Sequence, residues 1–426
     1  MAKLTKIALR SALLVSASIP LGIAGAHAAA TNYSLDTTIS IPATAVNNQG
    51  GAMTGFDISY FDSRGIYYFA DRSNASVDII SGATNTVLSQ AGGFAGQLSA
   101  TSISGPDGVV VGNNGGTFTL YAGDGGSTLR SFNVTNPSAP VAGTTVNTGG
   151  GQYRVDEMTI STNGTLFVAN NANSPSFATI LSTQPSLATT HSNITIPGQV
   201  ASGGMEASVY DPATGTFFVS VPTFNGTDPG GVQEYSTSGV PLRTYNFSTL
   251  SGGAITACSS SGIDLGASGN LMVGCNTAGA QAVVLNPSGT GSIVRTISAI
   301  TLTDELWYDP TTGNFYVTGT NPAGDRVIDV ISDATGAVLQ SIDLTQLGVG
   351  QSVNTHSVAV DPLNGNIFVP LEGTVGSATD TLCPRGCVAV FSETTSVPEP
   401  SSLPVLLASL AGLFGLTGLL RRFFLS

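Results

Sequence analysis

The chain alternates apolar and polar residues in short runs that turn-forming residues interrupt. Three stretches carry the full pattern: Glu206–Pro222 (EASVYDPATGTFFVSVP), Asp304–Thr320 (DELWYDPTTGNFYVTGT) and His356–Glu372 (HSVAVDPLNGNIFVPLE). In each, one run of β-branched and aromatic residues precedes an Asp-Pro-x-x-Gly turn and a second run follows it. Proline fixes φ at the second turn position, and glycine takes the left-handed position before the next strand. Each stretch therefore predicts an antiparallel hairpin.

Weaker copies of this hairpin fill most of the chain, which indicates an internal repeat. The glycines aligned at the hairpin turns are Gly65, Gly108, Gly164, Gly215, Gly269, Gly313 and Gly365, spaced 43 to 56 residues apart. Another pair of strands follows each hairpin, as in ASVDIISGATNTVLSQ. Seven units of four strands predict an all-β, seven-bladed β-propeller over residues 51–393. A β-sandwich array or a β-helix is the alternative, but a β-helix has a much shorter period, and radial closure removes exposed sheet edges.

In architecture, the body resembles the broad propeller superfamily of YVTN-type surface repeats, NHL-like repeats and lactonase propellers. The resemblance covers roughly residues 50–393 and brings no family-defining catalytic motif. The sequence has no G-x-S-x-G elbow, no HExxH and no P-loop lysine. The resemblance therefore implies a fold and leaves the activity open.

Charge limits the classes of partner. Charged residues make up only 9% of the chain. Five of the 13 basic residues lie in the two end segments, so the body carries eight basic residues against nearly all of the 26 acidic ones, a net charge near −18. Such a body repels phosphate backbones, so nucleic acid is not an expected partner. Cations and neutral glycans are compatible with it.

Residues 1–28 are expected to be a secretory signal peptide. A basic start precedes an apolar stretch, and Ala-His-Ala at 26–28 forms a small-x-small cleavage site. The alternative, an N-terminal membrane helix, is disfavoured by the small residues and Pro20. Residues 29–50 are expected to form an N-terminal strand or linker.

The other end of the chain predicts a transmembrane helix. Residues 403–420 are 18 uncharged residues, which at about 1.5 Å per residue just cross a hydrocarbon core of about 30 Å. Residues 394–402 form the linker before this helix. The tail at 421–426 begins with two arginines, which are expected to stay cytoplasmic.

Val397-Pro398-Glu399-Pro400 stands at the start of this segment, and its two prolines keep the site extended. The order of a Pro-Glu-Pro motif, an apolar span and an arginine pair resembles the PEP-CTERM sorting signal, which is processed by exosortase, a membrane-embedded enzyme of Gram-negative bacteria. A plain single-span anchor would explain the helix and the arginines but not the Pro-Glu-Pro motif. The resemblance covers about the last 30 residues. It implies exosortase as the processing partner, an inner-membrane precursor held transiently by the helix, and a final position at the cell surface or outside the cell. The residues that carry it are Pro398, Glu399, Pro400, Arg421 and Arg422.

Titratable residues recur eight or nine positions before the turn glycines, where each unit's first strand begins. The five are Asp57, Asp156, Glu206, Asp304 and His356. In the other two units the position falls at about Ala100 and at Ser261. In a propeller the first strands line the central channel, so we expect the five side chains to converge at one end of it. Carboxylates placed together repel one another, and Ca²⁺ or Mg²⁺ would relieve the repulsion. The alternative is a structural role, in which these side chains only bond neighbouring blades.

The four cysteines all lie in the expected exported body. An oxidising compartment favours two local disulfides, Cys258–Cys275 and Cys383–Cys387, over a four-cysteine zinc site. The sequence as a whole favours an exported, non-catalytic binding or structural propeller of the cell envelope or extracellular matrix, with exopolysaccharide or an envelope component as partner. The alternative is an exported, metal-dependent enzyme similar to lactonases or lyases, with the acidic and histidine residues at its channel mouth.

Overall fold

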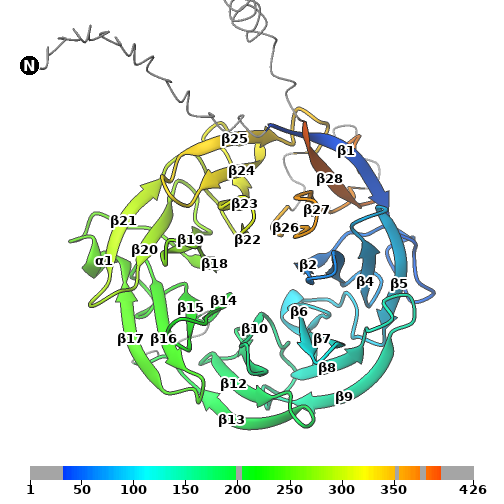
Figure 1. Ribbon diagram of the computed structural model, residues 1–426, viewed down its shortest axis with the longest axis horizontal. Coiled ribbons are helices and arrows are strands. Elements are labelled where there is room, and N and C mark those ends of the chain that lie inside the picture. Colours follow the sequence, from blue (N-terminus) through cyan, green and yellow to red (C-terminus); the bar gives the residue numbers. More distant parts are fainter. Residues whose placement is uncertain (1–31, 198–203, 351–354, 375–379, 395–426) are drawn as a thin grey trace, which may run out of the picture. The chain divides into compact units, whose positions relative to one another are not determined.

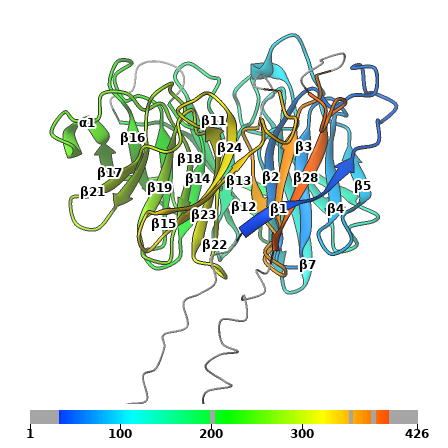
Figure 2. The same ribbon diagram turned by 90° about the horizontal axis from the view of Figure 1, so that it is seen from above.

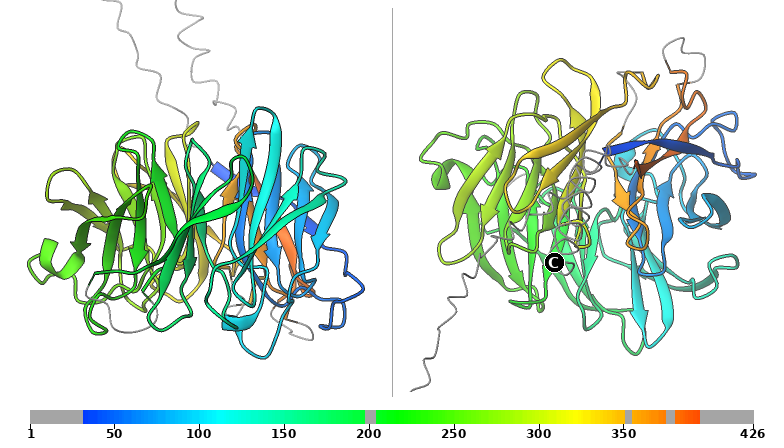
Figure 3. Two further views of the ribbon diagram at one scale, coloured as in Figure 1. Left: turned by 90° about the horizontal axis from the view of Figure 1, so that it is seen from below. Right: turned by 45° about the horizontal axis from the view of Figure 1, so that its top comes forward.

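The computed structural model describes residues 32–197, 204–350, 355–374 and 380–394. They form seven four-stranded antiparallel sheets arranged radially around a central channel (Figure 1). The strands run between the two faces of the ring (Figures 2 and 3). The prediction of a seven-bladed propeller with four strands per blade is confirmed.

Within each blade the chain runs from the channel outwards. The innermost strands are β2 (Phe56–Phe61), β6 (Val109–Asn114), β10 (Met158–Ile160), β14 (Ser208–Asp211), β18 (Ser260–Leu265), β22 (Leu306–Asp309) and β26 (Ala359–Val360). The second strands are β3 (Ile66–Asp71), β7 (Thr117–Asp124), β11 (Thr165–Asn170), β15 (Thr216–Val221), β19 (Leu271–Cys275), β23 (Asn314–Thr320) and β27 (Ile367–Leu371). The third strands are β4 (Ser76–Ser81), β8 (Thr128–Asn133), β12 (Phe177–Ser182), β16 (Gly231–Ser236), β20 (Ala282–Asn286), β24 (Arg326–Ser332) and β28 (Cys387–Thr394).

The outer strands are β5 (Thr86–Gly92), β9 (Val141–Asn147), β13 (Ala188–Ile194), β17 (Pro241–Asn246), β21 (Ser292–Ile297), β25 (Val338–Asp343) and, in the seventh blade, β1 (Asn32–Ser40). Within the described ranges, two short helices occur in connections: a 3₁₀ turn at Thr101–Ile103 and α1 (Phe247–Leu250). No helix among the described residues is long and apolar enough to span a membrane. The expected signal peptide (1–28), transmembrane helix (403–420) and sorting residues lie outside the described residues.

The first strand of the chain closes the ring. β1 pairs antiparallel with β28, from Asn32 opposite Thr394 to Ser40 opposite Cys387. The propeller therefore takes in residues that precede position 51. The hydroxyl groups of Tyr33 and Tyr316 lie 2.7 Å apart and tie this closing strand to the sixth blade. Closure leaves the seventh sheet with a full set of four strands.

The apolar core is divided among the seven junctions between neighbouring blades. Each junction has one cluster of buried side chains drawn from the two facing sheets. Between the third and fourth blades, for example, Phe167 packs on Phe217 with ring centroids 5.5 Å apart. The second and third strands are buried along most of their length, because both of their faces meet a neighbouring blade.

The second blade corrects one sequence prediction. Gly108 is not the hairpin glycine, because it precedes β6 rather than following it. The β6–β7 turn is instead made by Gly115 and Gly116, which have φ of 57° and 92°. Gly108 is needed for a different reason: a Cβ atom there would lie 2.2 Å from the carbonyl oxygen of Asp156 in the third blade. The turn glycines Gly65, Gly115 and Gly164 are thus about 50 residues apart, closer to a regular repeat than the predicted spacing.

All four cysteines are paired in the structure. Cys258, just before β18, is bonded to Cys275 at the end of β19. Cys383 is bonded to Cys387, the first residue of β28. One disulfide therefore joins two strands of the fifth blade, and the other closes a short loop next to the closing pair of strands.

Candidate functional site

Seven equivalent positions at the start of the innermost strands surround one end of the channel. They are held by Asp57, Asp107, Asp156, Glu206, Ser261, Asp304 and His356. We call the six titratable residues of this set the channel mouth. The structure brings together the five residues singled out by sequence, since the pKa of Glu206 responds to Asp156 and that of Asp304 responds to both Asp57 and His356. Ala100 was assigned to the second blade in error, because the true position is Asp107.

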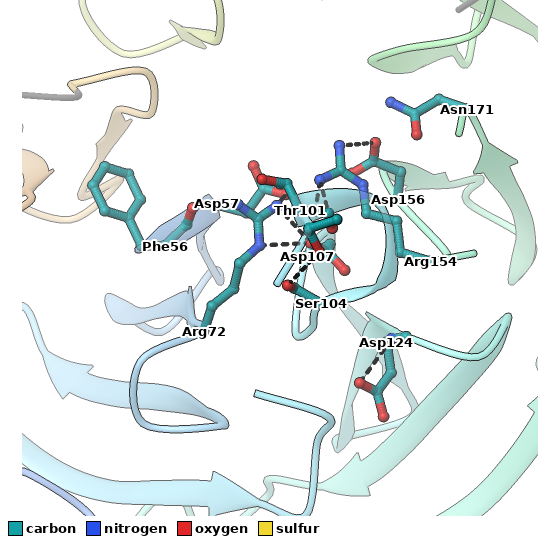
Figure 4. Close-up of polar contacts among 12 residues, drawn as sticks. Phe56, Asp57, Arg72, Thr101, Ser104, Asp107, Asp124, Arg154, Asp156 and Asn171 are labelled. Atoms are coloured by element: carbon teal, nitrogen blue, oxygen red, sulfur yellow. Dashed lines mark hydrogen bonds and ion pairs between the residues drawn. The ribbon is translucent and has the colours of Figure 1, made fainter. Parts of the chain in front are cut away.

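Two buried arginines hold three of the aspartates. Arg72, which follows β3, contacts Asp57 and donates from Nε to Asp107 Oδ1 at 2.8 Å. Arg154 donates from Nη2 to Asp156 Oδ2 at 2.7 Å, and its Nη1 atom lies 3.7 Å from Asp107 Oδ1. Figure 4 shows the two guanidinium groups approaching Asp107 from opposite sides. Asp107 is fully buried, and burial raises its pKa well above the ordinary value although both guanidinium groups act to lower it.

Arg72 and Arg154, which we call the arginine clamp, occupy the place that a metal ion would take among the three aspartates. Carboxylate oxygens of Asp57, Asp107 and Asp156 lie within 4.8 Å of one another, a spacing that a cation could bridge. The guanidinium groups already bond these carboxylates. The three aspartates are therefore an ion-pair network rather than a vacant ligand set.

His356 joins the seventh blade to the first. Its Nε2 atom lies 3.2 Å from Asp57 Oδ1, and its ring stacks on Phe56 with centroids 4.6 Å apart. Burial opposes protonation of His356, but the hydrogen bond and charge of Asp57 and the charge of Asp304 raise its pKa above the ordinary value. Burial likewise acts to raise the pKa of Asp57, but Arg72, His356 and Arg154 hold it well below the usual range. The pair therefore favours an imidazolium bonded to a carboxylate.

The other side of the channel has two acidic residues, Glu206 and Asp304, on which His356 or Arg154 acts only through charge, without an ion pair among the described residues. Burial and the charge of Asp156 raise the pKa of Glu206 to about 8, although Asn171 Nδ2 donates to its Oε2 atom at 2.9 Å. Burial also raises the pKa of Asp304, and no side-chain hydrogen bond to its carboxylate occurs among the described residues. None of the ion pairs within the described ranges includes either residue. This half of the mouth can hold protons or bind a cation.

A polar cavity of about 520 Å³ opens over the mouth. Asp57, Arg154, Asp304 and His356 form part of its wall. The connection that contains the 3₁₀ turn at Thr101–Ile103 contributes much of the remainder. The cavity thus exposes both the imidazole–carboxylate pair and one of the unpaired carboxylates to small solutes.

Sequence reasoning missed Asp107, Arg72 and Arg154. Asp107 had a usable signal, because it lies eight residues before Gly115 just as Asp57 lies eight before Gly65. No comparable sequence signal pointed to Arg72 or Arg154. Arg72 follows a second strand and Arg154 precedes an inner strand, so no repeat position relates them.

Comparison with known proteins identifies a fold and no family. No family model matches the chain, and no curated protein matches its sequence. Among solved structures, the chain is similar to Raptor from Chaetomium thermophilum, with a TM-score of 0.59 and 11% identity over 87% of this chain, although the match spans only 30% of Raptor. It is also similar to a chain of a mitotic checkpoint complex, with a TM-score of 0.58 and 13% identity over 91% of this chain and 98% of the other. The WD40 β-propeller domain of Doa1 matches with a TM-score of 0.56 and 15% identity over 85% of this chain and 98% of that domain. At these identities the likeness establishes the propeller fold alone.

Proposed function

We propose that this protein is an exported, exosortase-sorted β-propeller of the cell envelope or extracellular matrix that acts by binding, and that its channel mouth takes up a divalent cation. One observation carries the binding proposal: Glu206 and Asp304 stand at the mouth without an ion-pair partner among the described residues, beside three aspartates that Arg72, Arg154 and His356 already contact. Placing carboxylates in a poorly solvated site is costly unless a proton or cation accompanies them. Oxygen donors of this kind suit Ca²⁺ or Mg²⁺.

Within the sequence-predicted set, the cation ligands are Glu206 and Asp304. Asp57, Asp156 and His356 have other partners, so they shape the site and do not complete the ligand set. Water and a bound polyanion or glycan would supply the remaining oxygens that these cations require.

Isothermal titration calorimetry of the purified chain with Ca²⁺ and Mg²⁺ tests cation binding. We expect saturable binding in the wild type, at least a tenfold loss in the Glu206→Gln/Asp304→Asn double variant, and no loss in Asp36→Asn, which removes one exposed acid elsewhere. Equal heats in all three proteins would reject the mouth as a cation site.

Three features support export. They are the signal-like start, the Pro-Glu-Pro tail with its arginine pair, and the pairing of all four cysteines, which is typical of oxidising compartments. Expression in a Gram-negative host with and without exosortase tests the proposal. Mass spectrometry is expected to find a mature N-terminus near residue 29 in both hosts, but loss of the C-terminal segment only where exosortase is present. Substitution of Glu399 by Ala is expected to block the second cleavage.

A second candidate function is an exported, metal-dependent hydrolase or lyase. The observation that favours it is the Asp57–His356 hydrogen bond on the wall of the 520 Å³ cavity, because a carboxylate-bound imidazole can transfer a proton. A panel of lactones and uronate-containing glycans, assayed with Ca²⁺ or Mg²⁺, distinguishes the two functions. Turnover that His356→Gln abolishes would establish the enzyme; binding without turnover supports the binding protein.

A further inference from the structure

Deeper in the channel, a second cavity of about 280 Å³ lies below the mouth. It is lined by residues one to four positions further along the inner strands than the mouth residues. Because side chains alternate along a strand, the residues one and three positions on share a face. We call this cavity the inner channel and define it by Tyr60, Glu157, Asp264, Glu305, Trp307 and Tyr308.

Aromatic rings form one side of the inner channel. Tyr60 of the first blade and Trp307 of the sixth meet edge to face, with centroids 5.5 Å apart. They come together across the seventh blade, which carries only the small residue Ala359 at the equivalent position. Tyr308 follows Trp307 in the lining, but its ring packs on Phe315 with centroids 4.9 Å apart. Tyr60, Trp307 and Tyr308 are all half-buried.

Three carboxyl groups lie in the polar lining, together with the hydroxyl residues Ser59, Thr159, Ser208 and Ser357. Glu157 and Glu305 are buried, with 8% and 9% of their surface exposed, and lie close enough to share a hydrogen bond. Burial is the first cause that raises the pKa of each well above the ordinary value. Asp264 accepts bonds from the backbone N–H groups of Tyr308 at 2.7 Å and Leu265 at 2.8 Å. No lysine, arginine or histidine is among the lining residues.

We propose that the inner channel binds a small organic cation through an alkylated or quaternary ammonium group. Aromatic faces attract such a cation through their quadrupole, and Trp attracts it most strongly. A carboxyl group of Glu157 or Glu305 that releases its proton when the cation enters provides the opposite charge. A bare divalent metal ion fits less well, because it requires six or more oxygen ligands, whereas much of this wall is aliphatic, including Val110, Val209 and Leu306. The volume admits only a small ligand.

The chain contains a built-in reporter of this site, because Trp307 is its only tryptophan. Fluorescence titration of the purified protein with choline is expected to give a saturable change. Neohexyl alcohol, the uncharged carbon analogue of choline, has the same shape without the charge and is expected to bind at least tenfold more weakly. Equal affinity for the two, or no saturable change with choline, would overturn the proposal.

Single substitutions in the inner channel distinguish a loss of choline recognition from a loss of folding. Tyr60→Leu removes one aromatic face and is expected to weaken choline binding about tenfold, whereas Tyr60→Phe keeps the face and restores affinity. Glu305→Gln keeps the shape, removes a carboxyl group that can ionise beside the cation, and is expected to weaken the binding of choline but not of its neutral analogue. Asp36→Asn serves as the surface control. A loss in Tyr60→Phe as large as that in Tyr60→Leu would contradict recognition through the ring.

Two further arms complete the experiment. An acetylated trimethyl-lysine amide carries the same ammonium group on a peptide-like ligand, so its affinity relative to choline tells whether the source is a side chain or a free small molecule. Choline binding does not depend on export or on a cation at the mouth. It is therefore expected to survive in Glu206→Gln, so the failure of either proposal leaves the other standing.

Discussion

The Nε2 atom of His356 lies 3.2 Å from Asp57 Oδ1, which links the last blade of the ring to the first through the channel. These residues are 299 positions apart in the chain. The contact sits where the seventh and first blades meet, the same junction that β1 must complete on the outside. Its protonation state therefore bears on both the chemistry of the mouth and the integrity of the ring.

The first prediction concerns this pair. The pKa of His356, measured by NMR of the imidazole protons, is expected above the ordinary value near 6.5 and to fall in Asp57→Asn. The folded-state pKa of His356 is raised, so its contribution to the free energy of unfolding is complete below about pH 6.5 and is lost as pH rises through the folded value. Asp57 is the opposite case, because its pKa is lowered: its contribution is present above about pH 4 and is lost as pH falls towards the folded value. An unchanged His356 pKa in Asp57→Asn would contradict the link.

The second prediction concerns Glu206. Its pKa of about 8 lies above the ordinary value of 4.5, so the folded protein holds a proton that the unfolded chain has released. Because of this raised pKa of Glu206, the free energy of unfolding falls as pH rises from about 4.5 to about 8. Glu206→Gln is expected to flatten this decline in urea titrations run at several pH values. If Ca²⁺ binds at the mouth, the stabilisation it gives to the wild type grows over the same interval, because the ion replaces the proton.

The third prediction concerns the arginine clamp. Arg72→Met keeps the length of the side chain but removes the nearest counter-charge from Asp57 and Asp107, so the free energy of unfolding is expected to fall by about 3 kcal/mol. Arg130 pairs with Asp124 at 2.7 Å, but its side chain is 31% exposed. Arg130→Met is therefore the matched control, with an expected loss of about 1 kcal/mol or less. If urea titrations show similar losses of the free energy of unfolding in the two variants, burial does not make the Arg72 ion pairs more important for stability than the partly exposed Arg130 pair.

The fourth prediction concerns the disulfides. Cys258 and Cys275 are 17 residues apart, and the loop entropy removed from the unfolded chain corresponds to about 3 kcal/mol. Cys383 and Cys387 are four residues apart, for which the same relation gives about 2 kcal/mol. Replacing each pair by serine is expected to lower the free energy of unfolding in that order. Thiol titration of the denatured wild type is expected to find no free thiol, and four free thiols would reject both bonds.

The repeat could be predicted because each hairpin is specified by the residues of its own turn and flanking strands. Each hairpin turn needs a left-handed residue, so Gly65, Gly164 and their equivalents recur at the blade period whatever the rest of the chain does. The same logic failed at Gly108, since that glycine serves packing against Asp156 and not a turn. One misplaced turn then hid Asp107, the most buried member of the mouth.

The remaining features depend on contacts between distant parts of the chain. Arg72 and Arg154 reach Asp107 from 35 and 47 residues away, from positions that no symmetry relates. The pairing of Tyr60 with Trp307 arises only because Ala359 leaves room between them. Local sequence patterns do not predict which distant side chains come into contact when the ring closes.

The pairing of β1 with β28 also sets an order on assembly. The outer strand of the seventh sheet is made first and its three inner strands last, so the seam cannot be sealed until residue 394 has left the ribosome or the translocation pore. Until then β1 has no partner, and the first blade has no neighbour on that side. Contacts of such long sequence separation slow folding. The ring of an emerging chain therefore stays open until its last strand is made, which is compatible with the export proposed above.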